Sequence, residues 1–454
     1  MKAAPDRTRP PEPGPLPRVE LPDFHRFRPA EAPFRVWVAE DRDLPEVSVR
    51  LLVEAGATGE PEGREGVAEL TSRLLTEGTE SRSAMEMAEW LDRLGAGFSA
   101  SVSYDLAFLT VNALADTLEG ALDFLREAVR EPTFPADELE RVRQELVDEL
   151  QRDRDDADVV ADHALIRAVY GDHRYGTPAS GLPERVGELT RADVSRYFEA
   201  RYGSMDAAFV VCGDVEAERV RDGLARRFGD WRAGSGRPEP GPPPDRAPEA
   251  GRVTVVDRPE SHQADLRLGA VGLPYGSDDF YAARVANCVL GGLFNSRINM
   301  NLREEKGWTY GARTRFAARR LPGPFLGEAA VQTDAAASAL AEFRDEIRGL
   351  WERPPTDEEL QLARNSLVNS LPRHFETAEQ VTRRVAAQLA YDLPEDYWER
   401  YQDRIREVDR GAVVDAARRR LDPSGLTAVV VARAEEVVPE LERSFDEVEV
   451  RSGP

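Results

Sequence analysis

The chain contains few residues of the type that bind transition metals. Its five histidines include no pair spaced three or four residues apart, the spacing that places two imidazoles on one face of a helix. They are His25, His163, His173, His262 and His374. We therefore expect this chain to hold no catalytic zinc.

An arginine and a tyrosine lie seven residues apart in the segment LFNSRINMNLREEKGWTYGARTRF, residues 293–316. The pattern predicts a helix that ends at Gly307 and a strand that follows it. Arg303 would then lie at the end of the helix and Tyr310 at the start of the strand.

Cys212 and Cys288 lie in the apolar contexts FVVCGD and ANCVLGG. Thiols in such contexts are more often buried core residues than partners in a disulfide, so we expect a reducing compartment. The N-terminal MKAAPDRTRPPEPGPLP has no apolar signal core, and no apolar run reaches 18 residues. These features predict a cytoplasmic protein with no membrane span.

The composition favours a folded protein that does not bind nucleic acid. The 454 residues are 41% hydrophobic and 32% charged, as in globular domains. With 60 Lys and Arg against 84 Asp and Glu, the net charge of −24 would repel phosphate backbones and anionic lipid.

Two breaks in the pattern divide the chain. Residues 1–30 are rich in Pro, Arg and Glu and indicate a flexible N-terminal segment, and residues 233–250 indicate a Pro/Gly-rich linker. We expect one domain over residues 31–232 and a second over 251–454. The segments 189–218 and 408–437 share one layout of helix, turn, apolar strand and acidic residues, which suggests an internal duplication.

Each half follows the same order of elements. The first has predicted strands over 34–40, 47–56, 97–104, 105–114 and 207–212, and helices over 65–76, 83–94, 117–130, 136–155, 157–170 and 190–201. The second has strands near 252–257, 264–271, 308–317, 325–331 and 426–432, with helices near 278–302 and over 335–420. The fold class is α+β, with two homologous halves, each a mainly antiparallel sheet covered by helices.

The segment 293–316 resembles the C-terminal half of the pitrilysin/insulinase-type zinc metallopeptidases, the family of mitochondrial processing peptidase. Residues 169–202, the VVCGDVEAE run and TDEELQLARNSL at 356–367 also look like landmarks of that family. The resemblance covers residues 31–440. It implies that Arg303 and Tyr310 contact the substrate carbonyl or its tetrahedral intermediate.

In such enzymes the first half carries H-x-x-E-H, two zinc ligands and a Glu that activates water. The matching stretch here, GVAELTSRLLTEGT, has Glu69 and Arg73 at the histidine positions and Ser72 at the catalytic one. The family's third ligand matches Glu149. We expect Arg73 to replace the zinc charge between two carboxylates, with a solvated helix face as the alternative.

The resemblance also implies that substrate adds as a strand at an edge whose pattern ends in Asn-Ala. Ser99 and Ala100 stand there, so the Ala is kept and the Asn is replaced. A plain solvated edge is the alternative reading. His173 matches a landmark but is more simply a structural residue.

Taken together, the residues favour the non-catalytic subunit of a heterodimeric zinc peptidase. The partner would carry H-x-x-E-H and the zinc, this chain would bind no cofactor, and the substrates would be short unfolded peptides. One alternative is a catalytically dead scaffold or peptide-binding protein of the same fold. Another is an enzyme that uses a different metal or none, against which Arg73 argues.

Overall fold

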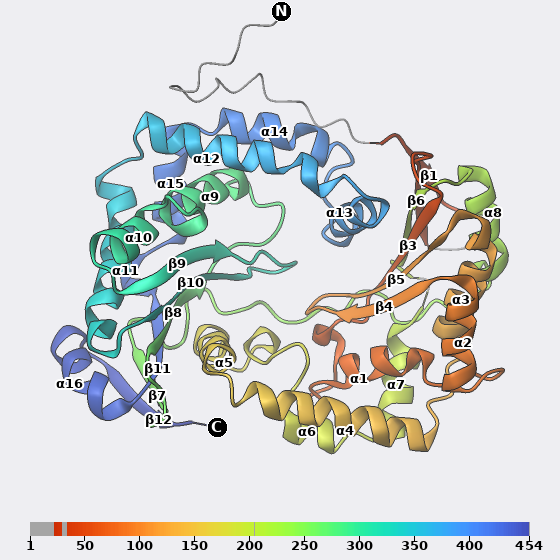
Figure 1. Cartoon of the computed structure of the whole chain (residues 1–454), viewed down its shortest axis with the longest axis horizontal. Helices are drawn as coiled ribbons and strands as arrows, with labels where there is room; N and C mark the ends of the chain where they lie inside the picture. Colours follow the sequence, from red (N-terminus) through yellow and green to blue (C-terminus); the bar gives the residue numbers. More distant parts are fainter. Residues whose placement is uncertain (1–21, 30–33, 204, 454) are drawn as a thin grey trace, which may run out of the picture.

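The computed structural model describes residues 22–29, 34–203 and 205–453. Two six-stranded sheets face each other, each backed by helices on its outer side (Figure 1). Most neighbouring strands are antiparallel, and β2–β6, β7–β11 and β7–β12 are parallel. The predicted α+β class with two similar halves is confirmed.

The first sheet has the order β1-β2-β6-β3-β5-β4. Its strands, in that order, are Phe24–Phe27, Arg35–Glu40, Ala208–Gly213, Glu46–Val53, Ala107–Leu114 and Gly97–Val102. The helices of this part of the sequence are α1 (Val67–Arg73), α2 (Ala84–Leu94), α3 (Leu118–Arg130), α4 (Ala136–Asp153), α5 (Ala157–Tyr170), α6 (Pro183–Gly187), α7 (Arg191–Arg201) and α8 (Ala217–Phe228).

The second sheet has the order β12-β7-β11-β8-β10-β9 and repeats the first in five strands. The sixth differs, because β12 is parallel to β7 whereas β1 is antiparallel to β2. The strands of the second sheet are Val448–Ser452, Val253–Asp257, Thr427–Ala432, Ala264–Val271, Pro324–Val331 and Thr309–Phe316. Its helices are α9 (Phe280–Asn287), α10 (Arg297–Asn299), α11 (Ala336–Glu352), α12 (Asp357–Ser370), α13 (Ala378–Ala390), α14 (Tyr397–Glu407), α15 (Arg410–Arg420) and α16 (Ala434–Ser444). β6 and β11, the strands of the predicted duplication, hold the same sheet position.

Two predictions made from the sequence differ in detail from the structure. The N-terminal segment expected to be flexible contributes β1, which pairs with β2, and the Arg26 guanidinium lies 4.5 Å from the Trp37 ring centroid; residues 1–21 lie outside the described residues. The helix expected over 278–302 is interrupted: π-helical turns at Cys288–Gly292 and Met300–Glu305 flank α10. Gly291 packs so closely on β9 that a Cβ there would lie 2.5 Å from Thr314 Oγ1.

Each sheet is covered on its inner face by a helix from the other half of the sequence. Helix α5 packs on β8 and β11 of the second sheet, and α13 packs on β3 and β6 of the first. Leu165 and Val429 share one of these cores, and Val385 and Val210 share the other. The inner face of each sheet is thus covered by a helix of the other half, and only the outer face is covered by helices of the same half.

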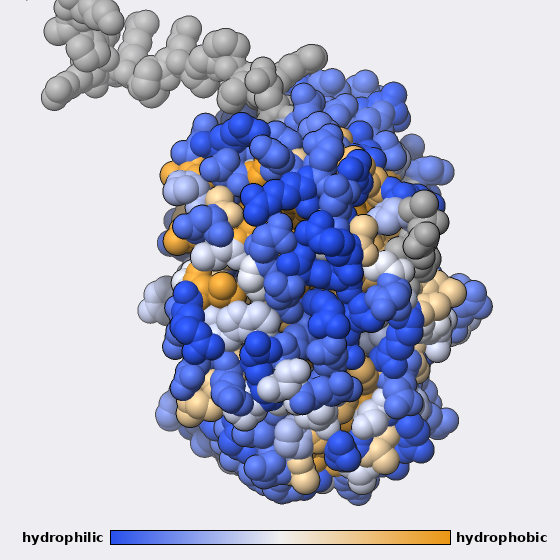
Figure 2. All heavy atoms as spheres, turned by 90° about the vertical axis from the view of Figure 1, so that its right-hand side faces the viewer, coloured by the Kyte–Doolittle hydropathy of each residue, from blue (hydrophilic) through white to orange (hydrophobic). Residues whose placement is uncertain are grey.

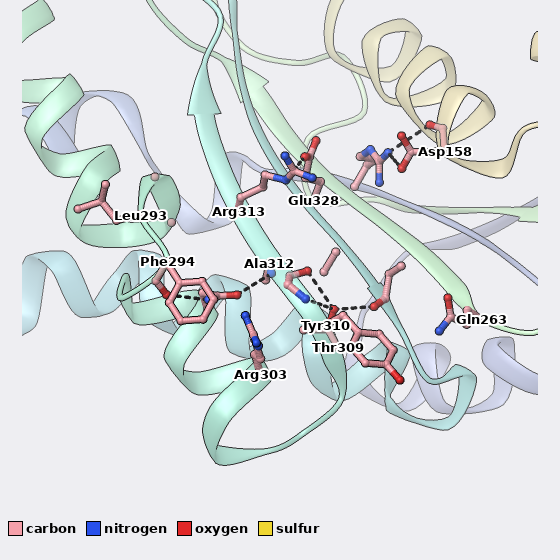
Figure 3. A pocket seen from close by; sticks show the side chains of 17 residues that line it. Asp158, Gln263, Leu293, Phe294, Arg303, Thr309, Tyr310, Ala312, Arg313 and Glu328 are labelled. Carbon is pink, nitrogen blue, oxygen red and sulfur yellow. Dashed lines mark hydrogen bonds and ion pairs between the residues drawn. The ribbon is translucent and has the colours of Figure 1, made fainter. Parts of the chain in front are cut away.

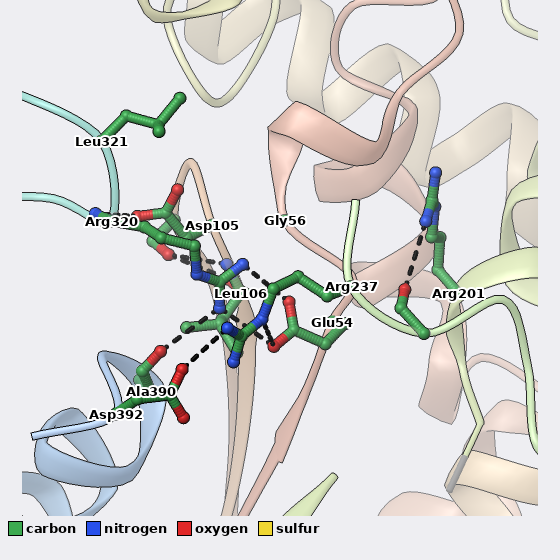
Figure 4. A network of polar contacts seen from close by, with 12 residues as sticks. Glu54, Gly56, Asp105, Leu106, Arg201, Arg237, Arg320, Leu321, Ala390 and Asp392 are labelled. Carbon is green, nitrogen blue, oxygen red and sulfur yellow. Dashed lines mark hydrogen bonds and ion pairs between the residues drawn. The ribbon is translucent and has the colours of Figure 1, made fainter. Parts of the chain in front are cut away.

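A buried ion-pair network joins the halves at the tip of the β9–β10 hairpin (Figure 4). Arg320 Nη1 and Nη2 lie 2.8 and 2.9 Å from the two carboxylate oxygens of Glu54, which is 2% exposed. The Arg320 backbone N–H donates to Asp105, and the Arg319 guanidinium lies 3.6 Å from the Tyr104 ring centroid. Burial raises the pKa of Glu54, and the hydrogen bonds from Arg320 oppose that rise.

The segment 233–252 contains no helix or strand, but its Arg237 takes part in this network. Arg237 Nη1 donates to Asp392 at 2.7 Å, and its Nε lies 3.4 Å from Glu54.

The outer face of the first half is mostly hydrophilic, with small scattered apolar patches (Figure 2). No helix in the described ranges is long and apolar enough to cross a membrane, and both cysteines are buried and free.

Replacing Arg320 by Ala should lower the free energy of unfolding by about 3–5 kcal/mol, because Glu54 would be left buried without a full counter-charge. Chemical denaturation followed by circular dichroism measures the change. Arg348→Ala, which breaks only the exposed pair with Asp345, is the matched control and should cost less than about 0.5 kcal/mol. Equal effects of the two substitutions would contradict the role of the network.

Candidate functional site

Arg73 lies between the two carboxylates that sequence analysis assigned to the degenerate metal site. On α1, its Nε donates to Glu69 Oε1 at 2.7 Å. Its two terminal nitrogens lie 2.8 and 3.2 Å from the carboxylate oxygens of Glu149 on α4. The hydrogen bonds from Arg73 lower the pKa of Glu149, so this carboxylate is ionised at neutral pH.

Glu60, which sequence analysis missed, holds α1 in place. The helix begins after Gly66, whose φ of +101° suits a glycine. Glu60 Oε1 accepts from the backbone N–H groups of Gly66 and Ala68, both at 3.0 Å. Arg174 Nε lies 3.0 Å from the other oxygen. Several acids surround this point in the sequence GEPEGREG, so no local signal singles out Glu60.

The residues at this position do not fit a zinc ion. Arg73 fills the space between the two acids, and within the described ranges no group of three His, Cys, Asp or Glu side chains could hold a metal. One buried hydroxyl oxygen nearby, that of Thr71, has no hydrogen-bond partner among the described residues. One histidine, His163 of α5, lines the same cavity of about 480 Å³.

Arg303 and Tyr310 line one cavity of about 570 Å³ in the second half (Figure 3). Arg303 belongs to the π-helical turn, and its guanidinium carbon lies 4.4 Å from the Phe294 ring centroid. Tyr310, at the start of β9, is 92% exposed. Asn299 fixes the turn to the strand: it donates to the Phe294 carbonyl at 2.7 Å and accepts from the Ala312 N–H at 3.0 Å.

The structure thus brings the predicted residues together in two groups rather than one. Glu69, Arg73 and Glu149 line the first cavity, and Arg303 and Tyr310 line the second. Strand β9 and helix α5 border both: Arg315 and Val159 line the first, and Arg313 and Asp158 line the second. Both cavities therefore adjoin the inner side of the second sheet.

Ser99 and Ala100 lie on β4, the edge strand of the first sheet. The Ser103 N–H donates to Leu106, and the alternation of an antiparallel ladder then turns the backbone groups of Ala100 away from β5. No described residue donates to or accepts from the backbone of Ala100 at this edge. The equivalent edge of the second sheet differs, because Asn299 occupies the outward N–H of Ala312. His173 accepts from the Tyr175 N–H, a local structural contact.

The fold is that of a two-sheet shell with two cavities beside α5 and β9. Residues 35–181 match the family model described as insulinase (peptidase family M16), and residues 188–367 match the model described as peptidase M16 inactive domain. The chain belongs to peptidase family M16. The resemblance to pitrilysin/insulinase-type enzymes is thereby confirmed.

Similar proteins span most of the chain. An uncharacterized zinc protease of Rickettsia bellii is 22% identical over 389 residues, 85% of this chain and 92% of that protein. The uncharacterized zinc protease YmxG of Bacillus subtilis is 25% identical over 287 residues, 61% of this chain and 66% of that protein. A peptidase M16 inactive domain from Pseudomonas fluorescens has the same fold, with a TM-score of 0.85, 24% identity, and coverage of 90% of this chain and 98% of that one.

Arg73→Ala should lower the free energy of unfolding by about 1–3 kcal/mol, because two acids would face each other without a cation. Arg93→Ala, which breaks the exposed Glu89–Arg93 pair of the same spacing, is the control and should cost less than about 0.5 kcal/mol. A carboxylate with a lowered pKa stabilises the fold above its unfolded pKa and loses this on acidification. The effect of Arg73→Ala should therefore be full at pH 7 and shrink below about pH 4.

Restoring the family motif should restore metal binding. The triple variant Glu69→His, Ser72→Glu, Arg73→His, together with the native Glu149, should bind one zinc per chain in equilibrium dialysis, because it recreates three protein ligands. Adding Glu149→Gln to the triple variant is the control and should weaken binding roughly tenfold or more. If the triple variant stays folded and takes up no more zinc than the wild-type chain, the position is wrongly assigned.

Proposed function

We propose that this chain is the non-catalytic subunit of a heterodimeric zinc peptidase. It supplies Arg303 and Tyr310 to the zinc site of a homologous partner that carries H-x-x-E-H and cleaves short unfolded peptides. One observation carries the proposal. The position of the metal is filled by Arg73, yet Tyr310 projects into solvent with no hydrogen-bond partner in the described chain.

The high exposure of Tyr310 leaves its phenol free to contact a bound molecule. A tyrosine side chain is amphipathic and is usually half-buried, and here 92% of it is open beside a cavity bordered by Arg303. Arg303 stacks on Phe294 and pairs only with the adjacent Glu304, at 3.4 Å. Its guanidinium is therefore held in place and remains available for an oxyanion.

In the proposed complex, the two chains divide the chemistry. The partner's zinc would polarise the scissile carbonyl and activate water. Arg303 and Tyr310 would donate hydrogen bonds to the oxygen that becomes negatively charged. An extended substrate would add to β4 beside Ser99 and Ala100, where the backbone groups of Ala100 point outward.

The alternative function is a scaffold or peptide-binding protein of the same fold. The ion pairs of Arg73 with Glu69 and Glu149 support the scaffold as well as they support the peptidase subunit. Either protein could fold without a metal, because Arg73 already joins the two acids. The two readings differ only in whether Arg303 and Tyr310 act on a substrate.

Affinity purification of the tagged chain from its source cells should recover a near-stoichiometric relative bearing H-x-x-E-H. In the reconstituted complex, Arg303→Ala and Tyr310→Phe should each lower kcat for peptide cleavage by about 10²–10³, because each removes a donor to the oxyanion. The melting temperature should not change. Arg418→Ala, at an exposed arginine of α15, is the control and should leave kcat unchanged.

If neither Arg303→Ala nor Tyr310→Phe changes kcat for peptide cleavage by the complex, the scaffold alternative is favoured. Recovery of the chain alone, or with an unrelated assembly, would do the same.

A further inference from the structure

Four arginines lie around α9, α13 and α14, and none of them forms an ion pair with a carboxylate of the described residues. Arg284 lies on α9, Arg373 in the turn Pro372–His374, and Arg383 and Arg384 on α13. Most arginines of the described chain form ion pairs within 4.0 Å, as expected where acids outnumber bases. The four form none. Arg373 and Arg383 are exposed and make no hydrogen bond with the described residues.

Two aromatic side chains of α14 bring the inner arginines together. The Arg284 guanidinium carbon lies 5.9 Å from the Tyr401 ring centroid, and that of Arg384 lies 5.9 Å from the Trp398 ring centroid. The two rings are 5.6 Å apart. The Nε atoms of Arg284 and Arg384 and the Trp398 Nε1 are buried and have no hydrogen-bond partner. These three individual donor atoms therefore have no acceptor among the described residues.

The charges of this cluster act on one another. Burial lowers the pKa of His374, and the positive charges of Arg384, Arg373, Arg383 and Arg284 lower it further, in that order. Burial also lowers the pKa of Arg384, followed by the charges of Arg383 and Arg284. Like charges held this close destabilise a folded chain unless an anion compensates for them.

The cluster continues onto the inner face of the first sheet. Burial lowers the pKa of Arg50 on β3, and the charge of Arg383 lowers it further, while Glu379 opposes the shift. Arg50 Nε donates to Thr110 on β5 at 3.0 Å. Thr110 is the cross-strand neighbour of Ser99 on the edge strand β4. Positive charge therefore extends from α9 to the strand proposed to receive substrate.

We propose that this arginine cluster binds the carboxylates of acidic peptides, so that the chain favours extended peptides rich in Asp or Glu. The guanidinium groups present planar pairs of donors that match carboxylate geometry. In a chain of net charge −24, such a cluster is also a local attractive centre for an anionic segment that the rest of the surface repels. The role of that peptide as a substrate rests on the proposed function; its binding does not.

Fluorescence anisotropy with the full chain alone tests this. The probes are a labelled extended peptide rich in glutamate and the same peptide with glutamine in place of glutamate. The acidic peptide should bind roughly tenfold or more tightly, and added NaCl should weaken it. The double variant Arg373→Ala, Arg383→Ala should remove most of this preference, and both of its sites are exposed, so folding should be unaffected. Arg418→Ala is the matched control, because Arg418 is also exposed and forms no ion pair with the described residues.

Equal binding of the two peptides, or an unchanged preference in the double variant, would overturn the proposal. Displacement of the acidic peptide by inorganic phosphate at an ionic strength where chloride has no effect would identify a phosphate site instead. These outcomes do not depend on a partner chain. Failure to find an H-x-x-E-H subunit would therefore remove the proposed function and leave acidic-peptide binding to be judged on its own.

Discussion

The exchange of helices between the halves is the constraint on which the rest of the structure depends. Each sheet has one face packed on its own helices and one face that would be open to water. Helix α5 of the first half covers β8 and β11, and α13 of the second covers β3 and β6. Burying these apolar faces links the two sheets, and the Glu54–Arg320 pair then fixes their relative position at the hairpin tip. Both cavities lie beside α5, so their shape depends on this exchange.

Arg73 ties α1 to α4 without a metal. A zinc ion between ligands from α1 and α4 would tie the two helices together through its charge. The Arg73 guanidinium does this with three hydrogen bonds to Glu69 and Glu149, and it cannot be removed by a chelator or by a change of pH near neutrality. Unlike a zinc ion, the Arg73 guanidinium supplies neither Lewis acidity nor an activated water.

Local patterns predicted most of the fold, and contacts between distant residues account for what they missed. Period-2 and period-3.6 patterns placed five strands in each half and missed the edge strands β1 and β12. The i,i+4 spacing of Glu69 and Arg73 predicted their contact. The exchange of α5 and α13 has no local signal, because an amphipathic helix does not show which sheet it will cover. Glu60 was missed for the same reason: its partners Gly66 and Arg174 are set by the tertiary fold. The interrupted helix before Arg303 depends on Gly291 packing against Thr314, a contact across 23 positions.

The two halves share most of their topology but differ at the edge strands β4 and β9. An antiparallel edge strand offers outward N–H and C=O groups at alternate residues, so any open edge can pair with an extended peptide. On β9 one such group, the Ala312 N–H, is already bonded to Asn299, the last residue of α10, which directly precedes the π-helical turn that carries Arg303. Fixing Arg303 beside the strand therefore closes that edge. On β4 no described residue bonds to the outward groups of Ala100, and the inner face beside it carries Thr110 and Arg50. In the second half, Asn299 therefore occupies an outward group of β9. In the first half, the outward groups of Ala100 on β4 stay open to an added strand.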